Sequence, residues 1–290
     1  MAAFTFNDSI MKWAASDMNM GQAMFVRGGF ATVFITVIAF YHGALSQPRM
    51  LLEPMVLLRT ASEVGATLFF LIALAHLPLA NVSAVLQALP LCVTMGAALV
   101  LGEPVGWRRW LSIMVGFVGV LIVVRPGFDG FSVYALYVLA CVLCCAVRDL
   151  ATRRIPQAVP SMLVSAATAF LVTVSGVVLI EPMGGWSPMD AATIALLGAA
   201  ACLVLVGYQF IIKAMRVGDI SFIAPFRYTA LLWAILLGIV IFHDMPDLPM
   251  IVGATVIVGS GLYMLLRERV RGRMLTAARS TAPSMGPDGV

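Results

Sequence analysis

The chain has 290 residues, of which 61% are hydrophobic and only 11% are charged, and its formal net charge is +4. A soluble domain carries about 25% charged residues, so this composition excludes an ordinary water-soluble enzyme or binding module and predicts an all-α polytopic membrane protein surrounded by lipid. The positive net charge does not indicate nucleic-acid binding, because the basic residues lie in short loops and in the C-terminal segment, where they act as topology signals.

Apolar runs bounded by Gly, Pro and charged residues recur along the chain. A run of about 20 apolar residues is long enough to cross a bilayer as a helix, so each run is a candidate transmembrane helix. The ten candidates, in chain order, are residues 2–16, 21–41, 54–74, 79–101, 110–124, 132–148, 160–180, 189–212, 220–242 and 248–266. Residues 267–290 are basic and then rich in Ser, Pro and Gly, which predicts a disordered cytoplasmic tail.

The distribution of charge predicts the orientation of these helices. With the basic tail in the cytoplasm and ten crossings before it, the loops on the cytoplasmic side hold most of the remaining basic residues, and the opposite loops are mainly acidic. The cytoplasmic set is Arg49, Arg108, Arg109, Arg153, Arg154, Lys213 and Arg216, with Arg148 at its margin. Since cytoplasmic loops are enriched in Lys and Arg, both termini are predicted to be cytoplasmic.

The second half of the chain resembles the first at a fixed offset. A shift of 141 residues (149 − 8 = 141) places "DSIMK" at Asp8 on "DLATR" at Asp149, and the same shift places Glu103 on Asp244. The chain is therefore predicted to contain two five-helix repeats, residues 1–127 and 128–266. Because five is odd, the second repeat would enter the membrane inverted, with a site between the halves near the midplane.

Two stretches resemble a known family. Residues 86–127, with "GEPVGWRRW" and "GFVGVLIVVRP", resemble the first repeat of the EamA branch of the drug/metabolite transporter superfamily, and residues 220–268 resemble the second. The usual Gly-Glu of the second repeat is replaced by His243-Asp244, a departure expected to lie away from substrate. The resemblance implies ten helices, a central cavity, and export of small metabolites across a bacterial inner membrane. The general pattern is similar to the family's amino-acid exporters, including the YddG-type aromatic amino-acid exporters.

Arg227 is the first candidate substrate-binding residue. It lies beside Pro225 in an apolar run and has no acidic residue three or four positions away. It could extend to the membrane interface or pair structurally with a carboxylate on another helix. It could also receive a substrate carboxylate, for which its planar guanidinium is suited. Glu63 is its expected partner across the bundle, although Arg59, one turn earlier, offers a local alternative.

Further candidates are polar residues in the other apolar runs. Asp8 and Lys12 are spaced i, i+4 and could pair locally, but their counterparts in the second half suggest a place near the axis that relates the repeats. Neutral hydrogen-bonding side chains on three other predicted helices could hold a zwitterion. They are Gln87, Tyr228, Tyr208 and Gln209.

The sequence thus predicts a secondary transporter that exports amino acids or similar small metabolites by alternating access. Exporters of other metabolites or drugs remain an alternative, and an intramembrane enzyme is a weaker one, because no catalytic constellation, metal motif or cofactor motif is visible. No enzyme activity, metal or cofactor is therefore expected; the partners are a small-molecule substrate and the bilayer. Proton coupling and facilitated diffusion are both left open, as are a monomer and a homodimer.

Overall fold

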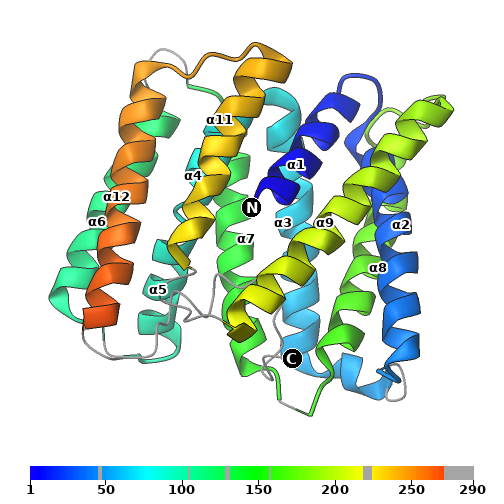
Figure 1. Ribbon diagram of the computed structural model, residues 1–290, viewed down its shortest axis with the longest axis horizontal. Helices are drawn as coiled ribbons and strands as arrows, with labels where there is room; N and C mark the ends of the chain where they lie inside the picture. The colour runs from blue at the N-terminus through cyan, green and yellow to red at the C-terminus, as the bar shows by residue number, and fades with distance from the viewer. Residues whose placement is uncertain (45–47, 104, 128–130, 157, 218–223, 271–290) are drawn as a thin grey trace.

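The structure is a computed structural model that describes residues 1–44, 48–103, 105–127, 131–156, 158–217 and 224–270. Helices account for nearly all of these residues, and no strand occurs among them (Figure 1). The elements are α1 (Ala2–Ala14), α2 (Met20–Tyr41), η1 (Pro48–Leu52), α3 (Pro54–His76), α4 (Leu79–Leu86), α5 (Leu89–Val100), α6 (Trp107–Val124), α7 (Tyr134–Arg154), α8 (Ser161–Ile180), α9 (Ala191–Val217), η2 (Ala224–Tyr228), α11 (Thr229–Phe242) and α12 (Leu248–Val270).

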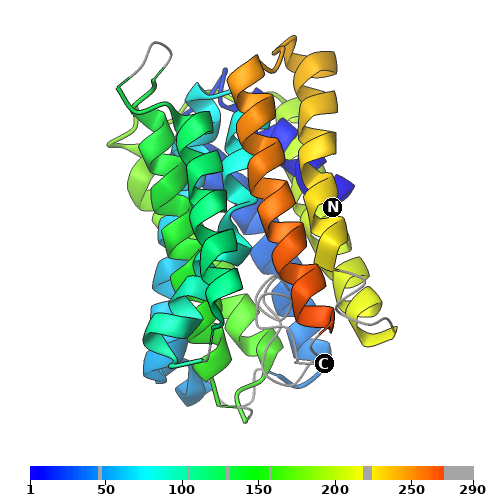
Figure 2. The same ribbon diagram turned by 90° about the vertical axis from the view of Figure 1, so that its left-hand side faces the viewer.

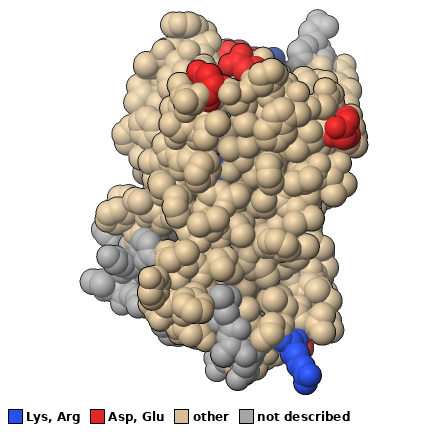
Figure 3. Space-filling view, turned by 90° about the vertical axis from the view of Figure 1, so that its right-hand side faces the viewer, with Lys and Arg blue, Asp and Glu red and all other residues tan. Residues whose placement is uncertain are grey.

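The helices are long and apolar enough to span a bilayer. Within the described ranges, seven spans of at least 18 residues meet this condition, with α4 and α5 together forming one of them, and two shorter apolar helices lie at 191–207 and 226–242. On the face drawn in Figure 3, acidic side chains lie towards the top of the view, a basic side chain projects at the bottom, and nearly all of the surface between them is uncharged. The prediction of an all-helical polytopic membrane protein is confirmed.

Two spans are interrupted at equivalent places in the two halves. The span of residues 79–100 breaks between α4 and α5, where Gln87 ends α4 and Pro90 opens α5. Of the predicted helix at 220–242, residues 220–223 lie outside the described part of the chain. The described part starts with the short 3-10 segment η2, which contains Pro225, and is α-helical from Thr229. Proline lacks the N–H that a continuous α-helix requires, which accounts for both interruptions.

Other helix ends differ from the sequence prediction. Helix α7 continues to Arg154, past the predicted end at Arg148, and therefore places Arg148 inside a helix. Helix α12 continues to Val270, which makes the first residues of the predicted tail helical, and residues 271–290 lie outside the described part of the chain. In both cases the apolar run ends at a basic residue while the backbone hydrogen bonds continue.

Helices from the two halves of the chain pack side by side. Helix α2 lies along α8, α3 along α7, α6 along α12, and α1 against α9 and α11 (Figures 1 and 2). Close approach of the backbones requires glycine at two of these contacts. A Cβ on Gly21 would lie 3.0 Å from the Gly176 carbonyl oxygen, and one on Gly253 would lie 2.7 Å from the Gly119 carbonyl oxygen. Small residues let helices approach in this way where no hydrophobic force drives them together.

The bundle has two ends, which we name from their place in Figure 1. The upper end holds the connections after α1, α3, α8 and α11, and the lower end holds those after α2, α5 and α7. The polar clusters divide between these two ends.

Candidate functional site

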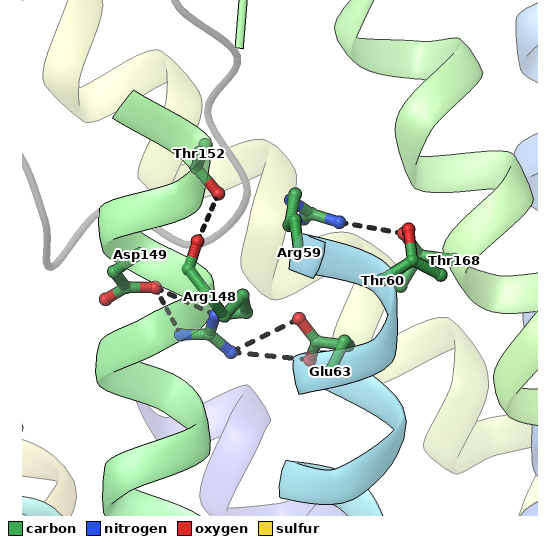
Figure 4. Close-up of polar contacts among 7 residues, drawn as sticks. All are labelled: Arg59, Thr60, Glu63, Arg148, Asp149, Thr152 and Thr168. Carbon is green, nitrogen blue, oxygen red and sulfur yellow. Dashed lines mark hydrogen bonds and ion pairs between the residues drawn. The ribbon is translucent and has the colours of Figure 1, made fainter. Parts of the chain in front are cut away.

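The lower half of the bundle contains a cluster of charged side chains on α3 and α7 (Figure 4). Arg148 donates from Nη1 to both oxygens of Glu63 at 3.3 Å, and from Nε to Oδ1 of Asp149 at 2.8 Å. The three side chains are only 15%, 20% and 5% exposed, in the order Arg148, Glu63 and Asp149. One guanidinium therefore neutralises two largely buried carboxylates from neighbouring helices.

A second polar contact lies one turn away on α3. Arg59 is buried and donates from Nη1 to the Thr168 hydroxyl on α8 at 2.8 Å, while the Thr60 hydroxyl is 3.4 Å from the same oxygen. In Figure 4 this contact lies beside the Glu63–Arg148 pair. Three helices, α3, α7 and α8, thus contribute charged or hydroxyl groups to one region.

Arg227 lies on η2, within electrostatic range of this cluster. Its charge interacts with those of Asp149 and Arg148. We expected Glu63 to pair with Arg227, and the structure instead gives Glu63 an ion pair with Arg148. The reason is that α3 and α7 pack along their length, so that Arg148 faces Glu63 directly. The cluster as a whole combines three guanidinium groups (Arg59, Arg148, Arg227) with two carboxylates.

Lys12 and Asp8 lie apart from this cluster, on α1. Lys12 does not pair with Asp8. Its Nζ lies 3.3 Å from Asp244, donates to the Leu77 carbonyl oxygen at 2.6 Å, and lies over the Phe242 ring. Asp8 instead accepts a hydrogen bond from the Asn7 side chain at 2.9 Å. The local i, i+4 pairing that the spacing allowed is therefore wrong, because each side chain finds a partner elsewhere.

The neutral candidates have different surroundings. Gln87 and Tyr228 are both buried, and each lies at the break in its span. Tyr228 packs with apolar residues of α5, α6 and α12, and a Cβ on Gly261 would lie 1.9 Å from its hydroxyl oxygen. That hydroxyl has no hydrogen-bond partner among the described residues. The hydroxyl lies against Gly261 of α12, and a role of Tyr228 in substrate binding stays a prediction. Tyr208 and Gln209 belong to α9, but their side chains lie outside the described part.

Two residues of these clusters were missed by the sequence reasoning. Arg148 was assigned to a loop margin, because the predicted helix ended there. Asp244 was recognised as the repeat counterpart of Glu103, but was expected to lie away from function. The 141-residue offset did align Lys12 with Arg153, but it did not show which acid each base contacts. No group of three or more metal-ligating side chains is found among the described residues.

Comparisons with known proteins identify the family. Residues 1–125 match the family model described as "EamA-like transporter family". The chain is 25% identical to an S-adenosylmethionine uptake transporter of Rickettsia prowazekii, with 91% of this chain and 89% of that protein aligned. It is 26% identical to a riboflavin transporter of Vibrio cholerae (93% and 92%) and 26% identical to a pseudopaline exporter of Pseudomonas aeruginosa (89% and 91%).

One solved structure, described only as a crystal structure of a protein, shares the fold. It aligns with a TM-score of 0.59 and 19% identity over 93% of this chain and 98% of that chain. The matching domain and the three relatives above, which are named as transporters or exporters, agree with one another. Residues 1–125 thus resemble an EamA-like transporter domain, and together with the relatives they support membership of the chain in the drug/metabolite transporter superfamily.

Proposed function

We propose that the protein is a secondary transporter that moves small metabolites bearing a carboxylate and an ammonium group, such as amino acids, across a bacterial inner membrane by alternating access. The observation that carries this proposal is the buried Arg148 bridge between Glu63 and Asp149, with Arg227 in electrostatic range. Buried charges in membrane helices are costly, so they are expected at substrate or ion pathways.

The proposal includes ten membrane crossings arranged as two inverted repeats. Helix packing supports it. The 141-residue shift makes α7 the counterpart of α1, α8 of α2, α9 of α3 and α12 of α6. Replacing each helix by its counterpart turns the α3–α7 contact into the α9–α1 contact, which is also present, and leaves the α2–α8 and α6–α12 contacts unchanged. Thr32 and Thr173, whose hydroxyl oxygens are 3.0 Å apart, are separated by the same 141 residues as the sequence repeat. These regularities are expected of two halves related by a twofold axis in the membrane plane.

The lower end is proposed to face the cytoplasm. It carries exposed Arg49, Arg108 and Arg154, whereas exposed Asp17, Asp190 and Asp247 lie at the upper end. This distribution follows the positive-inside rule. The two halves proposed for residues 1–127 and 128–266 would then both contribute helices to the central site, since α3 belongs to the first half and α7 to the second.

The site chemistry suits a zwitterion. A carboxylate of the substrate would bind a guanidinium, for which Arg227 remains the proposed partner, since its planar group can donate two parallel hydrogen bonds. The ammonium group would bind Glu63 or Asp149, each of which exchanges part of its contact with Arg148 for the substrate. We also propose export as the direction of transport. Among the relatives above, the Pseudomonas aeruginosa protein is named as an exporter, the Rickettsia prowazekii protein is named for uptake, and the name of the Vibrio cholerae protein gives no direction.

The test is substrate counterflow in proteoliposomes that contain the purified protein. Radiolabelled aromatic and aliphatic amino acids, S-adenosylmethionine and riboflavin are compared, with and without a pH gradient. We expect counterflow with at least one zwitterion, and its stimulation by the gradient would indicate proton coupling. Counterflow restricted to riboflavin, or release of solute without exchange as through a channel, would contradict the proposal.

Arg227 is tested in the same vesicles. Arg227→Ala should abolish transport of carboxylate-bearing substrates, and Arg227→Lys should also reduce it at least tenfold, because the bidentate geometry is lost, about 1.4 kcal/mol per factor of ten. Arg108→Lys, an exposed arginine that stacks on Trp107 at the lower end, is the matched control and should leave transport unchanged. Normal transport by Arg227→Ala would assign the substrate carboxylate to another cation.

A further inference from the structure

Two ion pairs connect the halves of the chain at opposite ends of the bundle. At the upper end, Lys12 of α1 lies 3.3 Å from Asp244, in the connection after α11. At the lower end, Arg153, in the last turn of α7, lies 3.2 Å from Glu103, in the connection after α5. In each pair the base belongs to one half and the acid to the other.

The two pairs are counterparts of each other. The shift of 141 residues carries Lys12 onto Arg153 and Glu103 onto Asp244, so it converts the upper pair into the lower one. Sequence alone aligned these four positions but did not indicate that the bases and acids meet. Their meeting is a structural observation, because Lys12 and Asp244 are separated by 232 residues and Arg153 and Glu103 by 50.

Each pair joins helices that carry or contact elements of the proposed site, since α1 contacts α3, α5 contacts α7, and α11 follows η2. The upper pair connects α1 to the end of α11, and Lys12 also donates to the Leu77 carbonyl oxygen at the end of α3. The lower pair connects α7 to the end of α5, and the neighbouring Arg154 donates to the Val100 carbonyl oxygen at 3.1 Å. The lysine and arginine are 15% and 19% exposed and their acids 32% and 35%, so both pairs are partly shielded from water.

We propose that Lys12–Asp244 is the upper gate and Arg153–Glu103 the lower gate of the transporter, and that one pair breaks while the other holds. This inference rests on the proposed function, since a gate requires a substrate path that opens to both sides. Both pairs are formed in this structure, so each end is held by its own bond. Partly exposed ion pairs contribute little individually, and losing one is expected to change the ratio of open to closed molecules up to about fivefold.

The experiment measures distances between spin labels in nanodiscs without substrate, by double electron–electron resonance. The upper reporters are Ser16 and Met245, both exposed beside the upper pair. The lower reporters are Ala158 and Arg108, both exposed near the lower pair. The five native cysteines, all of them free, are first replaced by alanine. Because no substrate is needed, the measurement remains valid even if the proposed substrate class is wrong.

The two pairs should give opposite results. Lys12→Gln, or the milder Asp244→Asn, should increase the long-distance population of the upper reporters up to about fivefold and leave the lower reporters short. Arg153→Gln should do the reverse. Exchanging the charges in the double variant Lys12→Asp with Asp244→Lys should restore the original distribution. Two variants for the upper pair keep the test usable if one of them does not fold.

A matched control separates gating from general loosening. Arg125 and Asp247 also form an ion pair at the upper end, but the 141-residue shift gives this pair no charged counterpart. Arg125→Gln should therefore leave both distances unchanged. The inference is overturned if neutralising either pair leaves the distances of its own end unchanged, if both neutralisations open the same end, or if the control opens an end as strongly as Lys12→Gln does.

Discussion

Replacing Arg148 by glutamine removes the one guanidinium that bridges Glu63 and Asp149. Its contacts, 3.3 Å to Glu63 and 2.7 Å to Asp149, would be lost together, and two carboxylates would be left close to each other. Oδ2 of Asp149 already has no hydrogen-bond partner among the described residues. The substitution therefore leaves buried negative charge with less compensation than before.

The size of the effect follows from burial. Removing one partner of a buried ion pair costs about 3–5 kcal/mol. The side chains of Arg148 and Glu63 keep 15% and 20% exposure, so the lower end of the range, about 3 kcal/mol, is the appropriate value. For a chain of this length, that corresponds to a fall of roughly 6 °C or more in the melting temperature.

The assay is thermal unfolding of the purified protein in detergent, followed by the amount that remains monodisperse on size exclusion. Arg49→Gln, an exposed arginine on η1, is the control and should change the melting temperature by no more than about 1 °C. The double variant Arg148→Gln with Glu63→Gln should recover part of the loss, because one of the two uncompensated carboxylates is gone.

The reasoning fails if Arg148→Gln melts at the same temperature as the unaltered protein, since the bridge would then contribute nothing. It also fails if the double variant is less stable than the single one by the full cost of losing Glu63, because the two side chains would then act independently.

Two further predictions concern contacts between α6 and α12 and at the adjoining ends of these helices. Gly253→Val should lower the melting temperature by the equivalent of about 1–3 kcal/mol, because a Cβ there would lie 2.7 Å from the Gly119 carbonyl oxygen. Gly259 has open space around it, so Gly259→Ala should be neutral or slightly stabilising. Burial alone would raise the pKa of Asp247, but the Arg125 guanidinium outweighs it and holds that pKa below its ordinary value. Its contribution to stability is therefore present above about pH 4 and lost as the pH falls further, so Asp247→Asn should flatten the acid side of a melting-temperature profile, and an unchanged profile would contradict this.

Helix positions could be predicted from the sequence because the length of an apolar run is fixed by the thickness of the bilayer. The spans at 21–41 and 160–180 agree with α2 and α8 to within one residue. The predicted end of a helix was less accurate where it was placed at a charged residue. The predicted span ending at Arg148 stopped at the first basic residue, although Arg148 is tolerated inside α7 because Glu63 and Asp149 neutralise it.

The partners of charged residues could not be predicted from local spacing. Lys12 and Asp8 share a helix face, and Glu63 has Arg59 one turn away, yet Lys12 pairs with Asp244 and Glu63 with Arg148. The partner of each charged side chain depends on which helices lie side by side, and hence on the tertiary packing of α1, α3 and α7. The sequence repeat held part of this information, because it aligned acids and bases that turned out to pair across the halves.

The hydrogen bond between Thr32 and Thr173 has a consequence for the transport cycle. If exchanging the roles of the two halves converts one open state into the other, then a contact between a residue and its own counterpart is converted into itself. The α6–α12 contact has the same property, since the neighbouring pairs Gly116–Ser260 and Gly119–Ile257 exchange places under the shift. Such contacts would then be the same in both proposed states. On that premise, the α2–α8 and α6–α12 interfaces, at opposite sides of the bundle in Figure 1, would form the stationary frame of the proposed cycle, and the helices between them would carry the movement.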